Sequence, residues 1–210
     1  MDGTILDSVN DIAENVNKML DKFGHRRLSL SEIKLIIGNG AKRLIEDALK
    51  LSGATFTEEE LDERLSYYND LYSASESPLT KPFDGIKRVI SELSLRGYKI
   101  AILSNKPQKT LDKVCSVFLN DVNIDKIVGE QDGVKCKPDK AATVALLKEL
   151  DVTAENCYFI GDGETDVITS LNAKTNGIAV LWGYRDKKRL LKAGAKVFAE
   201  TPADLLNLIP

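Results

Sequence analysis

Four short stretches of the sequence carry side chains that could bind a cation or a phosphoryl group: MDGT at residues 1–4, LSN at 103–105, KPD at 137–139 and GDGETD at 161–166. Asp2, Asp162 and Asp166 offer carboxylates, Lys137 an ammonium and Ser104 a hydroxyl. Carboxylate oxygens suit a hard divalent cation such as Mg²⁺, whereas a zinc site would normally need histidine or cysteine. The set favours metal-assisted chemistry on a phosphoryl group.

These stretches fall at the ends of expected β-strands. From Pro82 onward, helical patterns alternate with short apolar runs at residues 98–103, 126–129, 157–161, 177–183 and 196–199. Such alternation is typical of an α/β fold with a parallel, Rossmann-like sheet and helices on both faces. Because active sites in these folds lie beyond the carboxyl ends of the strands, we expect the polar stretches to meet at one edge.

The segment between the first and second polar stretches has a purely helical sequence pattern in its first part, residues 9–78. Apolar residues recur at helical spacing from Val9 until Gly24 ends the pattern. Capping boxes at Ser29 and Thr57 predict the starts of further helices. We therefore expect a core domain made of residues 1–8 and 79–210, interrupted by a helical cap domain of residues 9–78. Hinges are expected near residues 7–8 and within residues 73–82.

The composition of the chain argues against nucleic acids and membranes as binding partners. The chain has 210 residues, of which 43% are hydrophobic and 29% charged, and its net charge is −3. No basic field favours nucleic acid or an anionic membrane, and no apolar run is long enough to span a bilayer. Three widely spaced cysteines indicate neither a disulfide framework nor a zinc site. We expect a cytoplasmic protein, monomeric or homodimeric, that acts on a small phosphorylated metabolite.

The ordered set MDGT, LSNK, KPD and GDGETD resembles the four motifs of the haloacid dehalogenase superfamily. The helical stretch after the first motif is similar to the cap of that family, so the resemblance covers essentially the whole chain. Each motif alone could be an ordinary turn or helix start, and it is their order that carries the resemblance. Within the family, SNKP, GDGETD and WGYRD look most like phosphoglycolate phosphatases.

The resemblance implies roles for the charged residues. Asp2 matches the acid that protonates the leaving oxygen and then deprotonates water, and its main-chain carbonyl would bind Mg²⁺. Asp162 matches a carboxylate ligand of the metal. Asp166 matches the acid that holds the metal's water shell or Lys137, and Lys137 matches the lysine that neutralises charge on the nucleophile and the phosphate.

The phosphoryl group would be held by neutral side chains. The resemblance assigns this role to Ser104 and Asn105, with Thr4 beside them. In the cap, the GNGAKR segment at residues 38–43 is an anion-friendly loop whose Arg43 could bind a substrate carboxylate. The alternative, equally open from the sequence, is an ordinary turn between two helices in which Lys42 and Arg43 are exposed to solvent.

The family nucleophile is the first aspartate of D-x-D-G-T, and that position would lie one residue before Met1. We expect the strand that carries it to be missing as well. A start assigned too late, a shortened chain and a nonenzymatic remnant all explain this. The first is favoured, because Asp2, Ser104, Lys137, Asp162 and Asp166 are all present.

The resemblance implies Mg²⁺-dependent hydrolysis of a small phosphomonoester through an aspartyl-phosphate. The preferred substrate is 2-phosphoglycolate, which would yield glycolate and phosphate. A β-phosphoglucomutase or a pyrophosphatase of the same superfamily is the alternative among enzymes. An inactive metal- or phosphate-binding protein is the alternative from another class.

Overall fold

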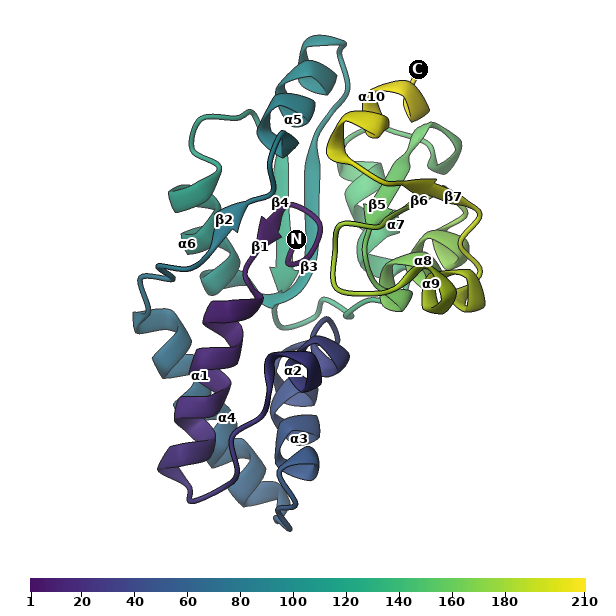
Figure 1. The fold of residues 1–210 in the computed structure, drawn as a ribbon. Coiled ribbons are helices and arrows are strands. Elements are labelled where there is room, and N and C mark those ends of the chain that lie inside the picture. Colours follow the sequence, from purple (N-terminus) through teal and green to yellow (C-terminus); the bar gives the residue numbers. More distant parts are fainter.

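The computed structural model describes residues 1–210, which form an α/β core with a helical cap below it (Figure 1). The strands are β1 (Leu6–Asp7), β2 (Lys81–Pro82), β3 (Ala101–Pro107), β4 (Lys126–Glu130), β5 (Tyr158–Gly161), β6 (Asn176–Val180) and β7 (Val197–Ala199). The core helices are α5 (Ile86–Leu95), α6 (Gln108–Phe118), α7 (Ala141–Glu149), α8 (Glu164–Ala173), α9 (Lys187–Ala193) and α10 (Leu205–Leu208). None of the helices is long and apolar enough to cross a membrane.

The cap consists of α1 (Val9–Lys22), α2 (Leu30–Ile36), α3 (Ala41–Leu51) and α4 (Glu58–Ala74). Ser29 and Thr57 each accept a hydrogen bond from the third residue of the helix that follows, and complete the expected capping boxes. The four helices share a hydrophobic cluster of 17 buried residues, which includes Val16, Ile45 and Leu49. The cap therefore has a core of its own.

The α/β core contains parallel strands, as the sequence predicted. β3 pairs with β4, and β5, β6 and β7 form a second parallel group. Helix α6 buries Leu111 and Cys115 against β3, and helix α8 buries Val167 against β6. The fold class is α/β with a Rossmann-like core. The LSN stretch lies within β3 where its regular pairing with β4 ends at Leu103, and the GDGETD stretch begins at the last residue of β5.

The parallel strands are divided into two sheets instead of forming one. Neither β3 nor β5 has a strand partner on the side that faces the other sheet. A cavity of about 600 Å³ is lined by Leu103 of β3, Phe159 and Ile160 of β5, and Leu146 of α7. Met1 lies at the wall of this cavity. An apolar space and two unpaired strand edges thus lie beside the start of the chain.

The two chain segments that join core and cap run side by side. β1 and β2 form an antiparallel pair in which Leu6 faces Pro82 and Asp7 faces Lys81. In the first turn of α1, the buried carboxylate of Asp11 accepts hydrogen bonds from Leu79 N at 3.0 Å and Thr80 Oγ1 at 2.5 Å. The segments in which we expected hinges, residues 7–8 and 73–82, both reach this junction.

Candidate active site

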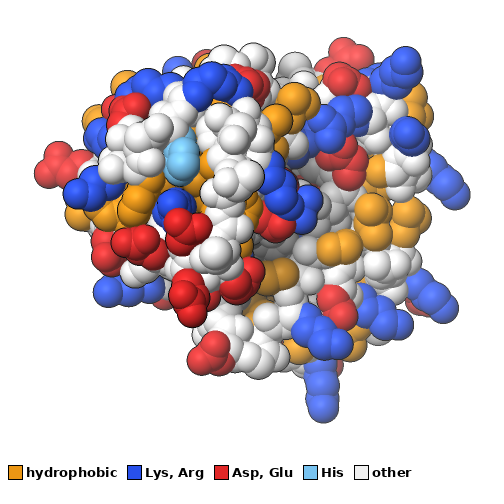
Figure 2. Space-filling model, turned by 90° about the horizontal axis from the view of Figure 1, so that it is seen from below, with side chains coloured by type: hydrophobic (Ala, Val, Ile, Leu, Met, Phe, Trp, Pro, Cys, Tyr) orange, Lys and Arg blue, Asp and Glu red, His pale blue; other side chains and the backbone are white.

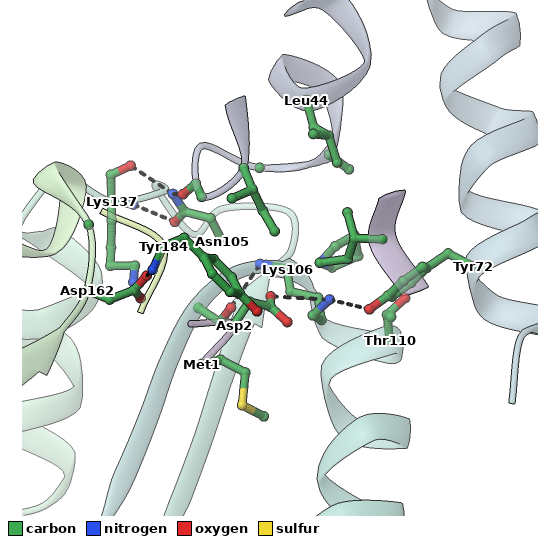
Figure 3. A pocket seen from close by; sticks show the side chains of 18 of the residues that line it. Met1, Asp2, Leu44, Tyr72, Asn105, Lys106, Thr110, Lys137, Asp162 and Tyr184 are labelled. Atoms are coloured by element: carbon green, nitrogen blue, oxygen red, sulfur yellow. Dashed lines mark hydrogen bonds and ion pairs between the residues drawn. The ribbon is translucent and has the colours of Figure 1, made fainter. Parts of the chain in front are cut away.

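A cavity of about 90 Å³ lies between the polar edge of the core and the cap. Six residues expected from the sequence line it: Asp2, Ser104, Asn105, Lys137, Asp162 and Asp166. Seen from the cap end, the surface is hollowed between the lobe that carries His25 and the opposite lobe, with acidic and basic side chains intermixed (Figure 2). Figure 3 shows side chains from the core and the cap meeting around the cavity.

Asp162 is held in a close-fitting cradle at the end of β5. Its Oδ1 accepts a hydrogen bond from Thr4 Oγ1 at 2.9 Å, and its Oδ2 accepts one from Tyr184 N at 3.0 Å. A Cβ atom at Gly3 would lie 2.1 Å from Oδ2, and one at Gly183 would lie 2.2 Å from the Cβ of Asp162. Only glycine at these two positions lets the backbone approach the carboxylate this closely. Thr4 thus supports Asp162 and does not line the cavity.

Lys137 and Asp166 form a buried ion pair. Lys137 Nζ lies 2.5 Å from Asp166 Oδ1, and their side chains are 9% and 15% exposed. Burial raises the pKa of Asp166, but the charge of Lys137, the nearby N-terminal ammonium and hydrogen bonds from Lys137 and Gly163 together outweigh this effect and lower the pKa overall. Asp166 therefore stays ionised and fixes the position of the ammonium in the cavity.

Asn105 connects three parts of the site. Its Oδ1 accepts a hydrogen bond from Lys137 N at 2.8 Å, and its Nδ2 donates to Lys137 O at 3.0 Å and to Gly38 O of the cap at 3.3 Å. The neighbouring Ser104 is buried, and its hydroxyl accepts a hydrogen bond from Lys106 N at 3.2 Å. Asn105 therefore positions the Lys137 loop, while the hydroxyl of Ser104 remains able to donate.

Asp2 contacts both the chain junction and a lysine that the sequence motifs did not single out. Ser8 Oγ donates to Asp2 Oδ1 at 2.6 Å, and Lys106 Nζ lies 3.3 Å from Asp2 Oδ2. Burial raises the pKa of Asp2. The charge of Lys106, with smaller contributions from the N-terminal ammonium and the hydrogen bond from Ser8, lowers it, and the net pKa is lowered. Lys106 also donates to the hydroxyl of Tyr72 in α4 at 2.9 Å, so it links core and cap (Figure 3).

The carboxylates offer a suitable donor set for Mg²⁺. Asp162 has no cationic side chain as a partner. Its pKa is raised mainly by burial and secondarily by the charge of Asp166. A divalent cation beside Asp162 would compensate this charge. No group of three or more histidine, cysteine or acidic side chains is clustered closely enough to hold a metal. Two carboxylates supplemented by main-chain oxygen and water suit Mg²⁺, which keeps several waters in proteins.

The cap loop reaches the site, but Arg43 does not. Gly38 and Gly40 line the cavity, and Asn39 Oδ1 accepts a hydrogen bond from Thr165 Oγ1 of the core at 2.8 Å. The side chain of Arg43 is 52% exposed and pairs with Glu46 and Asp47, 3.2 and 2.9 Å away on its own helix. The structure thus places the predicted loop at the cavity and directs its arginine elsewhere.

Two residues of the WGYRD stretch complete the site. Tyr184 lines the cavity, and its hydroxyl accepts hydrogen bonds from Ser8 N at 2.8 Å and Val9 N at 3.1 Å. The buried guanidinium of Arg185 pairs with Glu164 at 2.9 Å and donates to Ile37 O of the cap at 2.7 Å. The sequence signalled them only through the family resemblance, which gave neither a role at the junction.

Comparison with known proteins adds an independent line of evidence. Residues 1–180 match the model of the haloacid dehalogenase-like hydrolase family. The chain is 29% identical to a phosphoglycolate phosphatase of Colwellia psychrerythraea, covering 98% of this chain and 92% of that protein. It is also 29% identical to a phosphoglycolate phosphatase of Pseudomonas fluorescens, covering 100% of this chain and 76% of that protein.

The fold has close counterparts among solved structures. The crystal structure of a candidate phosphoglycolate phosphatase from Lactobacillus delbrueckii subsp. bulgaricus superposes with a TM-score of 0.93 at 29% identity, covering 100% of this chain and 95% of that one. The match to the family model extends from the MDGT stretch through GDGETD to the end of β6. The chain therefore belongs to the haloacid dehalogenase-like hydrolases.

Proposed function

We propose that the protein is a Mg²⁺-dependent phosphatase of small phosphomonoesters, with 2-phosphoglycolate as its preferred substrate. The observation that carries the proposal is the convergence of Ser104, Lys137, Asp162 and Asp2 on one small cavity beneath the cap. A cavity of about 90 Å³ favours a metabolite of a few heavy atoms over a macromolecule. The relatives named phosphoglycolate phosphatase support the choice of substrate.

The polar residues have separate tasks in this mechanism. A phosphoryl transition state spreads negative charge over its equatorial oxygens, so fixed donors and cations stabilise it. The hydroxyl of Ser104 donates to one of these oxygens, and the ammonium of Lys137, fixed by Asp166, opposes the charge. Asp2 gives a proton to the leaving oxygen and later removes one from the attacking water.

The metal would be held by oxygen atoms of three residues. These are the carboxylates of Asp162 and Asp166 and the main-chain carbonyl of Asp2. When bound, Mg²⁺ would stabilise negative charge that develops on the phosphoryl oxygens. The cradle of Thr4 and the Tyr184 amide orients Asp162 before any metal arrives.

The covalent step requires an aspartate that we place one position before Met1, at the end of an additional strand. The cavity between β3 and β5 supports this placement, because it is apolar and reaches Met1. A strand in this space could pair with the free edges of both β3 and β5. It would deliver its last residue beside Asp2 and Lys137.

The test is a panel of substrates offered to protein purified from the organism that makes it, with its mass determined. We expect Mg²⁺-dependent phosphate release, with the highest kcat/KM for 2-phosphoglycolate. A preference for sugar phosphates or pyrophosphate would contradict the proposed substrate. Absence of hydrolysis across the panel, with metal binding retained, would support a binding protein instead.

A further inference from the structure

Lys106 is a buried cation with no task in the phosphoryl chemistry proposed above. Its side chain is only 7% exposed, and it leaves β3 toward the cap (Figure 3). Tyr72 is its cap partner in two ways: the hydroxyl accepts its hydrogen bond at 2.9 Å, and the ring centroid lies 4.4 Å from Nζ. A buried lysine needs an anionic partner, and the one carboxylate that Lys106 pairs with in this structure is Asp2, 3.3 Å away.

The other two basic side chains of the cavity have closer carboxylate partners than Lys106 has. The cavity is lined by three basic side chains, Lys106, Lys137 and Arg185. Lys137 is held by Asp166, and Arg185 by Glu164 and main-chain carbonyls of the cap. Lys106 instead contacts Tyr72 of α4, and Tyr68 and Asn69 of the same helix also line the cavity.

The position of Lys106 relative to Asp2 indicates what it would meet. Asp2 is the proposed acid for the leaving oxygen, and Lys106 Nζ lies 3.3 Å from its Oδ2. The ammonium therefore lies beside the atoms that follow the bridging oxygen in a bound ester. In an ester of a short α-hydroxy acid, the carboxyl carbon is two bonds from that oxygen, within reach of such a cation.

We propose that Lys106 and the hydroxyl of Tyr72 bind the carboxylate of a short phosphorylated α-hydroxy acid. The ammonium of Lys106 turns from Asp2 toward the substrate carboxylate, while Tyr72 brings the cap into the same contact. This proposal rests on the proposed function and deepens it, because it assigns the selectivity for an acidic leaving group. Lys106 would thus bind the substrate carboxylate, the task that the sequence analysis gave to Arg43, whose side chain pairs with Glu46 and Asp47 on its own helix instead.

The experiment compares two ligands of similar size by calorimetry in the presence of Mg²⁺. They are 2-phosphoglycolate and ethyl phosphate, which lacks the carboxylate. The full chain is measured as wild type, Lys106→Met, Tyr72→Phe and Lys109→Met. The last variant is the control, because Lys109 is exposed at the start of α6, does not line the cavity, and carries the same charge.

We expect wild type and Lys109→Met to bind 2-phosphoglycolate more tightly than ethyl phosphate. Lys106→Met should weaken 2-phosphoglycolate by about 10- to 100-fold, the usual range for losing a hydrogen bond to a charged group. Its affinity for ethyl phosphate should stay within about threefold. Tyr72→Phe, which keeps the packed ring, should show a smaller loss confined to 2-phosphoglycolate.

Three results would overturn the proposal. They are equal affinity of wild type for the two ligands, an equal loss for both in Lys106→Met, and an unchanged preference in both variants. If Lys106→Met does not fold, Tyr72→Phe decides alone by the same comparison. Hydrolysis is assayed separately: selective binding without hydrolysis would contradict the proposed phosphatase activity and still support the carboxylate site.

Discussion

Asp162 carries a charge that no cationic side chain balances, in the most closely packed part of the site. Gly3 and Gly183 approach it so closely that any Cβ atom would collide, and Thr4 fixes one of its oxygens. Such exact placement of a buried carboxylate is costly unless the charge is used. The cradle therefore supports the proposed role of Asp162 as a metal ligand.

Replacing Asp162 by asparagine should remove this charge with little change in shape. In a chain extended before Met1 by the proposed strand and its aspartate, we expect Asp162→Asn to reduce Mg²⁺-dependent kcat by about 100-fold or more, because a metal clamp on the transition state is weakened. Phosphate release and Mg²⁺ binding by calorimetry measure the effect. Asp132→Asn, at an exposed acidic position, serves as control. Unchanged Mg²⁺ affinity in Asp162→Asn would refute the site.

Sequence reasoning succeeded for residues at the ends of strands and failed for side chains that cross between domains. The strand ends could be predicted because parallel strands bring their carboxyl ends to one edge, and Ser104 and Asp162 indeed line one cavity. Arg43 has acidic partners three and four residues ahead, and these local pairs compete with a distant role. Lys106 was missed because its partner, Tyr72, lies in another domain.

At the level of elements, Tyr184 fastens the start of α1 to the core. Its hydroxyl is the acceptor for the amides of Ser8 and Val9, which are the first donors of the helix. Ser8 has no side-chain cap bond at this helix start, so the tyrosine replaces a capping residue. The core thereby fixes the direction in which the cap leaves it.

Removal of this one hydroxyl should loosen the junction. Tyr184→Phe leaves the amides of Ser8 and Val9 without their acceptor, and we expect the unfolding free energy to fall by about 1–3 kcal/mol. Urea denaturation measures the change. Tyr67→Phe is the matched control, since the Tyr67 ring packs against Phe23 and its hydroxyl makes no hydrogen bond in the structure. Equal stability of wild type and Tyr184→Phe would contradict this role.

The elements themselves followed from the sequence to different degrees. Long amphipathic helices such as α1 and α3 were predictable, because several turns repeat the same apolar spacing. The two-residue strands β1 and β2 were not, because a pattern with a period of two needs more residues to be seen. Their pairing depends on the two linkers running side by side, which is a property of the whole fold.

For the whole molecule, the division between the sheets leaves two parallel strands with an unpaired edge. The free edges of β3 and β5 face a cavity of about 600 Å³ with largely apolar walls, so main-chain donors and acceptors lack strand partners there. A parallel strand in the cavity would satisfy these groups and cover the apolar residues. If such a strand also carried the proposed nucleophile, it would couple stability and catalysis at this one place.

Lengthening the chain tests that coupling. A chain extended before Met1 by an apolar strand ending in aspartate should unfold at higher denaturant concentration than the 210-residue chain, because the strand fills the cavity. Its rate of 2-phosphoglycolate hydrolysis should be several orders of magnitude higher, as expected when a covalent nucleophile is supplied. The same extension ending in asparagine is the control: it should restore stability without the rate. Comparable turnover by the 210-residue chain would show that a carboxylate already present, such as Asp2, makes the attack.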